Sequence, residues 1–270
     1  MLLRGPSADA AATLGDRLRA AISEVGSRKA AQVGEELFGV SGVLRTNPSL
    51  RRTVTDVSVD GRARGELVRG LFDGKVDPVT LDLVVGAVEQ RWTRPRDLPD
   101  TLENLGVEAV IRSADEPGRV ADELFAFEQV LVENPDLRSA LSDPSRSVSD
   151  KRDLLRGLLE GRTLSATARL VDQSLAGTYR TISVAMREYQ KVAAGVHGES
   201  VATVRAASEL SDGEQERLRS ALSTQYGRDV HLNIVVDPTV IGGIRVEIGD
   251  DVIDGTVSAR LADARRRLAG

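Results

Sequence analysis

The chain has 270 residues, a formal net charge of −5 and no cysteine, so disulfides and thiolate chemistry are excluded. It has no basic patch with interleaved aromatic residues, which argues against nucleic-acid binding. Hydrophobic residues make up 41% of the chain but aromatic residues only 3%. The core must therefore consist mostly of Leu, Val and Ala, a composition that favours packed helices.

The beginning of the chain predicts no signal peptide, because its first 21 residues lack a long apolar segment. A membrane-spanning helix needs about 18 or more consecutive apolar residues, and the sequence contains no such run. We therefore expect no direct membrane insertion.

An internal repeat dominates the first two thirds of the chain. Residues 37–76 and 124–163 are identical at 15 of 40 positions without a gap, where chance would give roughly two or three. The identities include an Asn-Pro pair, at 47–48 and again at 134–135. We interpret the repeat as the duplication of one helical unit.

Each copy predicts the same succession of helices. The first carries an apolar stripe at helical spacing, and the Asn-Pro pair ends it and starts a short second helix. A third helix ends at a glycine that both copies share. A fourth covers about 78–92 in one copy and 165–180 in the other, and helices near 8–24 and 97–113 complete the bundles. The stripes are Val33, Leu37, Val40 and Leu44 in the first copy and Val120, Leu124, Phe127 and Leu131 in the second.

Proline placement and a change of pattern give the expected domains. Pro95 and Pro99 suggest the boundary between the two copies. We expect a first helical bundle over 1–94, a second over 95–194, and a small α/β domain over 195–270. The expected fold class is α+β and mostly α, with two tandem duplicated helical bundles followed by the small C-terminal domain.

The last domain reads in the order β-α-β-β-(β)-α. Alternating apolar residues predict strands over 201–206, 232–236 and 244–248. Between the first two strands, Ser211 and Glu214 have the spacing of a capping box, which predicts the start of a helix.

Turn chemistry is dense after the second of these strands. Asp237-Pro238 ends the strand, because proline removes a ladder donor. Gly242-Gly243 predicts a bend or a close approach of two backbone segments, since glycine alone tolerates positive φ without cost. A branched side chain at Gly243 should therefore disrupt the domain.

A hairpin and a terminal helix close the sequence. Gly249-Asp250-Asp251 is typical of a turn, and the apolar residues after it restart the strand. Asp254 or Thr256 can cap the helix that follows. The apolar face of this helix consists of Val257, Leu261, Ala264 and Leu268, and Arg265, Arg266 and Arg267 lie in its last turns.

This segment resembles the C-terminal signature of the ATP synthase delta subunit, the bacterial counterpart of the mitochondrial oligomycin-sensitivity-conferring protein. Thr256 stands where the family usually has serine and keeps the hydroxyl. The resemblance implies a six-helix bundle followed by a small α/β domain, and the extra helical copy is similar to the actinobacterial variety. The matching positions are Asp237, Pro238, Ile241, Gly242, Gly243, Ile244, Val246, Gly249, Ile253, Asp254 and Gly255.

The residues themselves indicate no catalytic, cofactor or metal site. His197 and His231 are the only histidines, and without cysteine a structural or surface role is favoured over metal binding. The pair Asp250-Asp251 at a hairpin tip is more typical of turn solvation than of acid–base catalysis. No phosphate-binding loop is present.

Two further features could reflect ligands or partners. Trp92 and Tyr179 lie one repeat period apart, which favours packing in the core or between bundles over ligand stacking. The arginines at 265–267 could bind an acidic partner, but they equally suit the C-terminal end of a helix.

The resemblance implies a non-catalytic subunit in the peripheral stalk of a proton-translocating F-type ATP synthase, at the cytoplasmic face of the plasma membrane. It implies two partners: N-terminal helices of the alpha subunits, held by the N-terminal bundle, and the membrane-anchored stalk subunit, held by the C-terminal domain. No cofactor is implied. A cytoplasmic helical-repeat adaptor unrelated to ATP synthase is the alternative, and it would explain the duplication but not the signature.

A partner helix could lie in a bundle groove. We place a candidate groove at the stripe formed by Val33, Leu37, Val40 and Leu44. The alternative is that this stripe is ordinary core, which any helical bundle requires.

Overall fold

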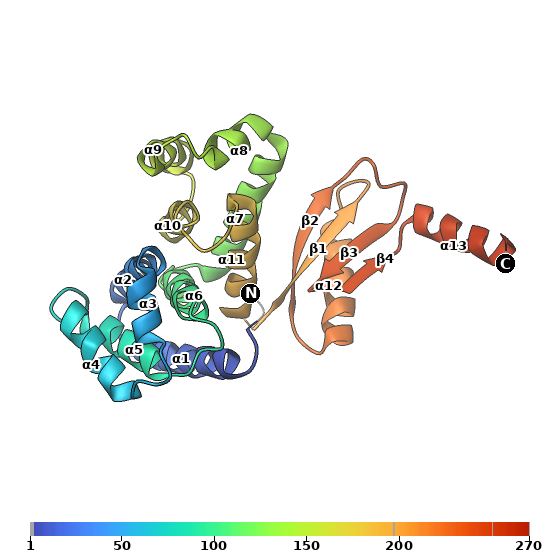
Figure 1. Cartoon of the computed structure of the whole chain (residues 1–270). Helices are drawn as coiled ribbons and strands as arrows, with labels where there is room; N and C mark the ends of the chain where they lie inside the picture. Colours follow the sequence, from blue (N-terminus) through green and yellow to red (C-terminus); the bar gives the residue numbers. More distant parts are fainter. Residues whose placement is uncertain (1–2, 197, 250, 270) are drawn as a thin grey trace. The chain divides into compact units, whose positions relative to one another are not determined.

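The computed structural model describes residues 3–196, 198–249 and 251–269 (Figure 1). The chain forms two compact units, one over 1–193 and one over 194–270. The first is helical and the second contains the sheet. The expected fold class, α+β and mostly helical, is confirmed.

The helical unit contains two successive sets of helices. The first set is α1 (Pro6–Ser23), α2 (Ser27–Thr46), α3 (Pro48–Val54), α4 (Gly61–Phe72), α5 (Pro78–Glu89) and α6 (Asp97–Arg112). The next helices are α7 (Pro117–Glu133), α8 (Pro135–Ser142), α9 (Val148–Leu159), α10 (Ser165–Gln173) and α11 (Ile182–Val196).

Helix boundaries recur at the period of the sequence repeat. α3 and α8 both begin with the proline of the Asn-Pro pair, and α4 and α9 begin and end 87 residues apart. The glycines that follow α4 and α9, Gly74 and Gly161, have φ of 69° and 70°. These are the left-handed values expected of a helix C-cap.

A pair of hydrogen bonds to a partly buried glutamate also recurs in both copies. Glu36 on α2 accepts hydrogen bonds from the backbone N–H of Asp77 (2.8 Å) and from Thr80 Oγ1 (2.6 Å), at the start of α5. Glu123 on α7 makes the equivalent two bonds at the start of α10, with the same lengths. Each copy thus joins its second helix to its fifth in the same way.

Helix α6 belongs to both sets. By the 87-residue period, α6 corresponds to α1 as the first helix of the second copy and to α11 as the last helix of the first. It is central, since 13 of its 16 residues are buried. The helices described over 1–193 therefore form two overlapping six-helix arrangements, α1–α6 and α6–α11. A division into domains at residue 94 stays a prediction.

The packing of α2 on α6 is close because glycines face each other. A Cβ added at Gly34 would lie 2.9 Å from the carbonyl oxygen of Gly106, and one added at Gly106 would lie 2.6 Å from the Phe38 ring. Side chains would hold the two helices further apart.

Two helices differ from the expectation. α10 ends at Gln173 and not near residue 180, because the segment after it bends back toward α6. The sequence pattern had not been interpreted as a helix at α11. Its buried residues Ala185, Met186, Tyr189 and Ala193 have helical spacing, so the apolar period was a signal that could have found it.

The second unit has the expected succession of strands and helices. It contains β1 (Ser200–Ala206), α12 (Asp212–Tyr226), β2 (Val230–Val236), β3 (Ile244–Ile248), β4 (Asp251–Asp254) and α13 (Val257–Ala269). The sheet order is β2-β1-β3-β4. β1 and β2 are parallel and joined through α12, whereas β3 is antiparallel to β1 and forms a hairpin with β4.

The capping box predicted before α12 is present, because the backbone N–H of Ser211 donates to Glu214 at 2.9 Å. The core of this unit lies between α12 and the sheet and is formed by Ala202, Val204, Leu222, Val230, Val246 and Ile248. In the described part of the chain, no helix is both long and apolar enough to cross a membrane.

Candidate interaction surfaces

The glycine pair of the signature segment makes a tight backbone crossing. Gly242 and Gly243 have φ of 64° and 77°. A Cβ at Gly243 would lie 2.4 Å from the carbonyl oxygen of Gly255. The backbone N–H of Val257 donates to the carbonyl of Gly242 at 3.1 Å, and that of Gly255 donates to Ile244 at 2.9 Å. The crossing joins the start of β3 to the start of α13.

Two aspartates of the signature act as turn caps. Asp237 accepts hydrogen bonds from the hydroxyl (2.6 Å) and backbone N–H (2.9 Å) of Thr239, which hold the pKa of Asp237 below its usual range. Asp254 accepts the same pair of bonds from Thr256 and has a lowered pKa for the same reason. Thr256 Oγ1 accepts from the N–H of Ala259 at 3.2 Å, so it caps α13.

An apolar surface lies around this crossing. We call it the C-terminal apolar surface, and it consists of Ile241, Val257 and Leu261, all exposed. Val252 and Ile253 are also exposed, on opposite faces of β4. Ile241 and Leu261 are the most open, with 69% and 65% of their surface exposed. β4 is the edge strand of the sheet, and α13 projects beyond it (Figure 1). Apolar residues grouped in this way are typical of protein–protein contacts.

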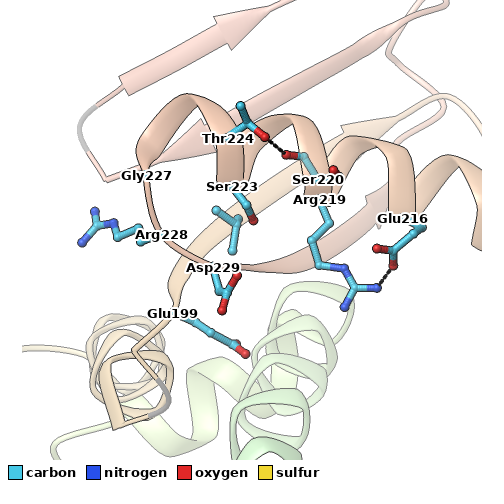
Figure 2. Close-up of a pocket in the computed structure, with 10 residues that line it drawn as sticks. Glu199, Glu216, Arg219, Ser220, Ser223, Thr224, Gly227, Arg228 and Asp229 are labelled. Atoms are coloured by element: carbon cyan, nitrogen blue, oxygen red, sulfur yellow. Dashed lines mark hydrogen bonds and ion pairs between the residues drawn. The ribbon is translucent and has the colours of Figure 1, made fainter.

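Beside the second half of α12 lies a polar hollow of about 810 Å³, shown in Figure 2. It carries both charge signs, with Glu216 and Arg219 paired on α12 and Glu199, Arg228 and Asp229 nearby. Ser220 and Ser223 have no histidine beside them in this hollow. Among the residues that line it, none forms the nucleophile–base pair that covalent catalysis requires.

The histidines and the hairpin aspartates do not gather into a site. His231 lies on β2 with Nδ1 3.7 Å from Glu199 Oε2. Asp251 accepts a hydrogen bond from the Tyr226 hydroxyl at 3.2 Å. His197 and Asp250 lie outside the described residues. Within the described part, no group of three or more potential metal ligands occurs.

Comparison with known proteins gives a consistent result over the whole chain. The family described as "ATP synthase delta (OSCP) subunit" matches residues 107–268. A protein of Nocardioides named ATP synthase subunit delta is 55% identical, with 99% of this chain and 98% of the relative aligned. The chain belongs to the ATP synthase delta (OSCP) subunit family. Proteins of the same name from Streptomyces coelicolor and Thermobifida fusca are 41% and 40% identical, covering 99% and 90% of this chain and 98% and 92% of their own lengths.

The matched range shows which copy is the additional one. The family pattern begins at residue 107, within α6, and extends through α13. The helices before it, α1–α5, are thus the extension relative to the general delta pattern. The delta subunits of Nocardioides and Streptomyces coelicolor align along nearly the full chain and include this extension. Members of the family are non-catalytic components of the synthase.

In this delta-family chain, the stripe proposed as a partner-helix groove lies in the core. Val33, Leu37, Val40 and Leu44 are between 0 and 2% exposed and pack with residues of α1, α5 and α6. These side chains therefore lie in the core, in agreement with the alternative that the stripe is ordinary core. A groove at this stripe stays a prediction, and it would require the core to open.

A buried glutamate that sequence reasoning missed connects the two copies. Glu103 on α6 is fully buried and accepts hydrogen bonds from the Arg45 guanidinium on α2, from the Tyr189 hydroxyl on α11 at 3.0 Å and from the N–H of Thr178 at 2.8 Å. A Cβ at Gly177 would lie 2.2 Å from the Glu103 carboxylate. The sequence gives no signal that singles it out, because Glu103 is one of four acidic residues in α6.

The aromatic residues singled out by the repeat take packing roles. Trp92 is buried, and its Nε1 donates to the carbonyl of Ala87 at 2.9 Å. Tyr179 packs edge-on against Tyr189 with ring centroids 5.8 Å apart. Burial raises the pKa of both tyrosines, so the Tyr189 hydroxyl remains a donor to Glu103. At the other end of the chain, Arg265 and Arg266 are exposed on α13.

Proposed function

We propose that this chain is a stator connector that keeps the catalytic head of the synthase from turning with the rotor. In this proposal the helical unit holds N-terminal helices of the alpha subunits, and the α/β unit holds the membrane-anchored stalk subunit. The chain then lies peripherally, at the cytoplasmic face of the plasma membrane. Its role is mechanical, because it transmits force between two partners and carries out no chemical step.

The C-terminal apolar surface is the observation that supports the proposed contact with the stalk subunit. A helix of 13 residues such as α13 is marginal in water without a partner. Its first apolar residues, Val257 and Leu261, are exposed and continue a patch that starts at Ile241. Burying one such side chain contributes about 1.5–3 kcal/mol, so a partner helix on this patch would stabilise both α13 and the complex.

The experiment is affinity purification of the tagged chain from its own organism. We expect the wild-type chain to recover alpha and stalk subunits together. Leu261→Asp combined with Ile241→Asp should lose the stalk subunit and keep the alpha subunits, because the two charges fall only on the α/β unit. Val57→Asp, which also alters an exposed apolar residue but lies in the helical unit, is the matched control and should keep the stalk subunit.

Two results would contradict the proposal. Recovery of neither alpha nor stalk subunits with the wild-type chain would remove the connector role. Full recovery of the stalk subunit with the double variant would remove the C-terminal apolar surface as the contact. The alternative of an unrelated adaptor is not supported, because the chain aligns with delta subunits along nearly its full length.

A further inference from the structure

A second hollow lies in the helical unit, where α3 and α6 begin. It has a volume of about 610 Å³ and is lined by Pro48, Arg51, Arg52, Arg94, Pro95, Arg96, Asp97 and Asp100. We call it the arginine pocket. Four guanidinium groups meet two carboxylates there, in a chain whose overall formal charge is −5. The local excess of positive charge is therefore opposite to that of the whole chain.

The carboxylates are already engaged within the fold. Asp97 accepts hydrogen bonds from the hydroxyl of Ser7 (2.8 Å) and from Nε of Arg94 (3.2 Å). Asp100 accepts one from the hydroxyl of Thr178. Both aspartates are less than 5% exposed. Asp97 therefore pairs with Arg94 and Asp100 with Thr178, and in the described chain neither aspartate pairs with Arg52 or Arg96.

The four arginines differ in the contacts that their side chains make within the fold. Arg51 donates to two backbone carbonyls at the end of α2, both at 3.0 Å, so it has a structural role. Arg94 forms an ion pair with Asp97, but its side chain is mostly exposed. Arg52 donates only to the carbonyl of Pro48, and within the described chain the side chain of Arg96 has no hydrogen bond or ion pair. Two guanidinium groups are thus open to a ligand.

The duplication supplies an internal comparison. Residues that both copies need for the fold recur after 87 positions, and Arg51 recurs as Arg138. Arg52, Arg94 and Arg96 do not, because the corresponding residues are Ser139, Thr181 and Ser183. The helical architecture therefore forms without these three arginines, and their presence in the first copy needs another explanation.

We propose that the arginine pocket binds a phosphate group, either as inorganic phosphate or as part of a nucleotide. Arginine presents a planar set of donors that matches phosphate oxygens in pairs. The volume lies in the range of small-molecule sites, about 300–1,000 Å³. Pro48 and Pro95 give the pocket fixed walls, since proline restricts the backbone. The inference is independent of the connector role, because the pocket consists of residues of the helical unit and the C-terminal apolar surface of residues of the α/β unit.

The test is isothermal titration of the dialysed full-length chain with inorganic phosphate, ADP and ATP at constant ionic strength, with adenosine as the uncharged control. We expect saturable binding at one site by at least one phosphate compound and none by adenosine. Comparison of phosphate with the nucleotides distinguishes the two sources. A charge-assisted bond is worth about tenfold in affinity or more, so Arg52→Ser with Arg96→Ser should weaken binding about a hundredfold.

The matched control is Arg28→Ser with Arg62→Ser, which removes the same charge from exposed sites outside the pocket. It should bind as the wild type does. Melting curves without ligand should be the same for all three proteins, because the altered side chains are exposed. Absence of binding by every phosphate compound, or equal affinity in the pocket variant, would overturn the proposal. Tighter, arginine-dependent binding of a hexaglutamate peptide would also overturn it, in favour of an acidic protein segment.

Discussion

Gly242 and Gly243 are neighbours that both have a positive φ, but their surroundings differ. An added Cβ at Gly242 would meet the methyl group of Val257 at 3.1 Å, and a side chain can move away. At Gly243 it would meet the carbonyl oxygen of Gly255 at 2.4 Å and the Cα of Thr256 at 3.1 Å. Backbone atoms that anchor both β3 and α13 cannot move independently. Gly243 is therefore the more constrained position.

We expect Gly243→Val to destabilise the α/β unit by about 3 kcal/mol or more, because left-handed strain and overpacking add. Gly249→Ala is the matched control. Gly249 has φ of 60° but open space around its Cα, so only the strain of about 1–2 kcal/mol should apply. Urea unfolding followed by circular dichroism measures both. Equal losses for the two variants would contradict the close approach at Gly243.

The cap before α13 could be expected from the sequence because its interactions are local. Asp237 and Asp254 each bond a threonine two residues on, a pattern that residue type and spacing reveal. Glu103 could not be assigned in the same way. Its partners Arg45, Thr178 and Tyr189 lie 58 to 86 residues away, and no local rule connects them.

At the level of elements, the repeat located most helices, but their ends depended on tertiary contacts. The fourth helix of the second copy was expected to reach residue 180, by analogy with the helix expected over about 78–92. α10 ends at Gln173 because the following segment places the N–H of Thr178 against Glu103. The helix α11 then supplies Tyr189 to the same carboxylate. One buried charge thus explains both the shortened helix and the position of the next.

We expect Glu103→Ala to lower the free energy of unfolding of the helical unit by about 3–5 kcal/mol. The substitution leaves the Arg45 charge without its carboxylate partner and the Tyr189 hydroxyl without an acceptor. The control is Asp16→Ala. Asp16 pairs with Arg19 at the surface, and loss of an exposed pair costs at most about 1 kcal/mol. Urea unfolding compares them, and similar midpoints for the two variants would contradict the role of Glu103.

At the scale of the whole molecule, the duplication predicted two bundles in tandem, and the contacts of α6 add that this helix packs with both sets. The identities between the two copies could not show this, because a helix that serves both copies has two counterparts, α1 and α11, and matches neither strongly in sequence. The sharing follows from burial. α6 contacts α1, α2 and α5 on one side and α7 and α10 on the other, so removing either set would expose an apolar helix face to water.

Sharing of α6 predicts that the helical unit unfolds in one transition. Trp92, the only tryptophan, is buried in the first copy and reports on it by fluorescence. Hydrogen exchange of α7–α10 reports on the second copy. Because α6 cannot remain buried when either side is lost, both probes should give the same midpoint in urea. Leu83→Ala, which creates a cavity in the first copy at a cost of about 2–5 kcal/mol, should lower both midpoints together. Two separate transitions, with only the Trp92 signal shifted by Leu83→Ala, would instead support independent domains divided at residue 94.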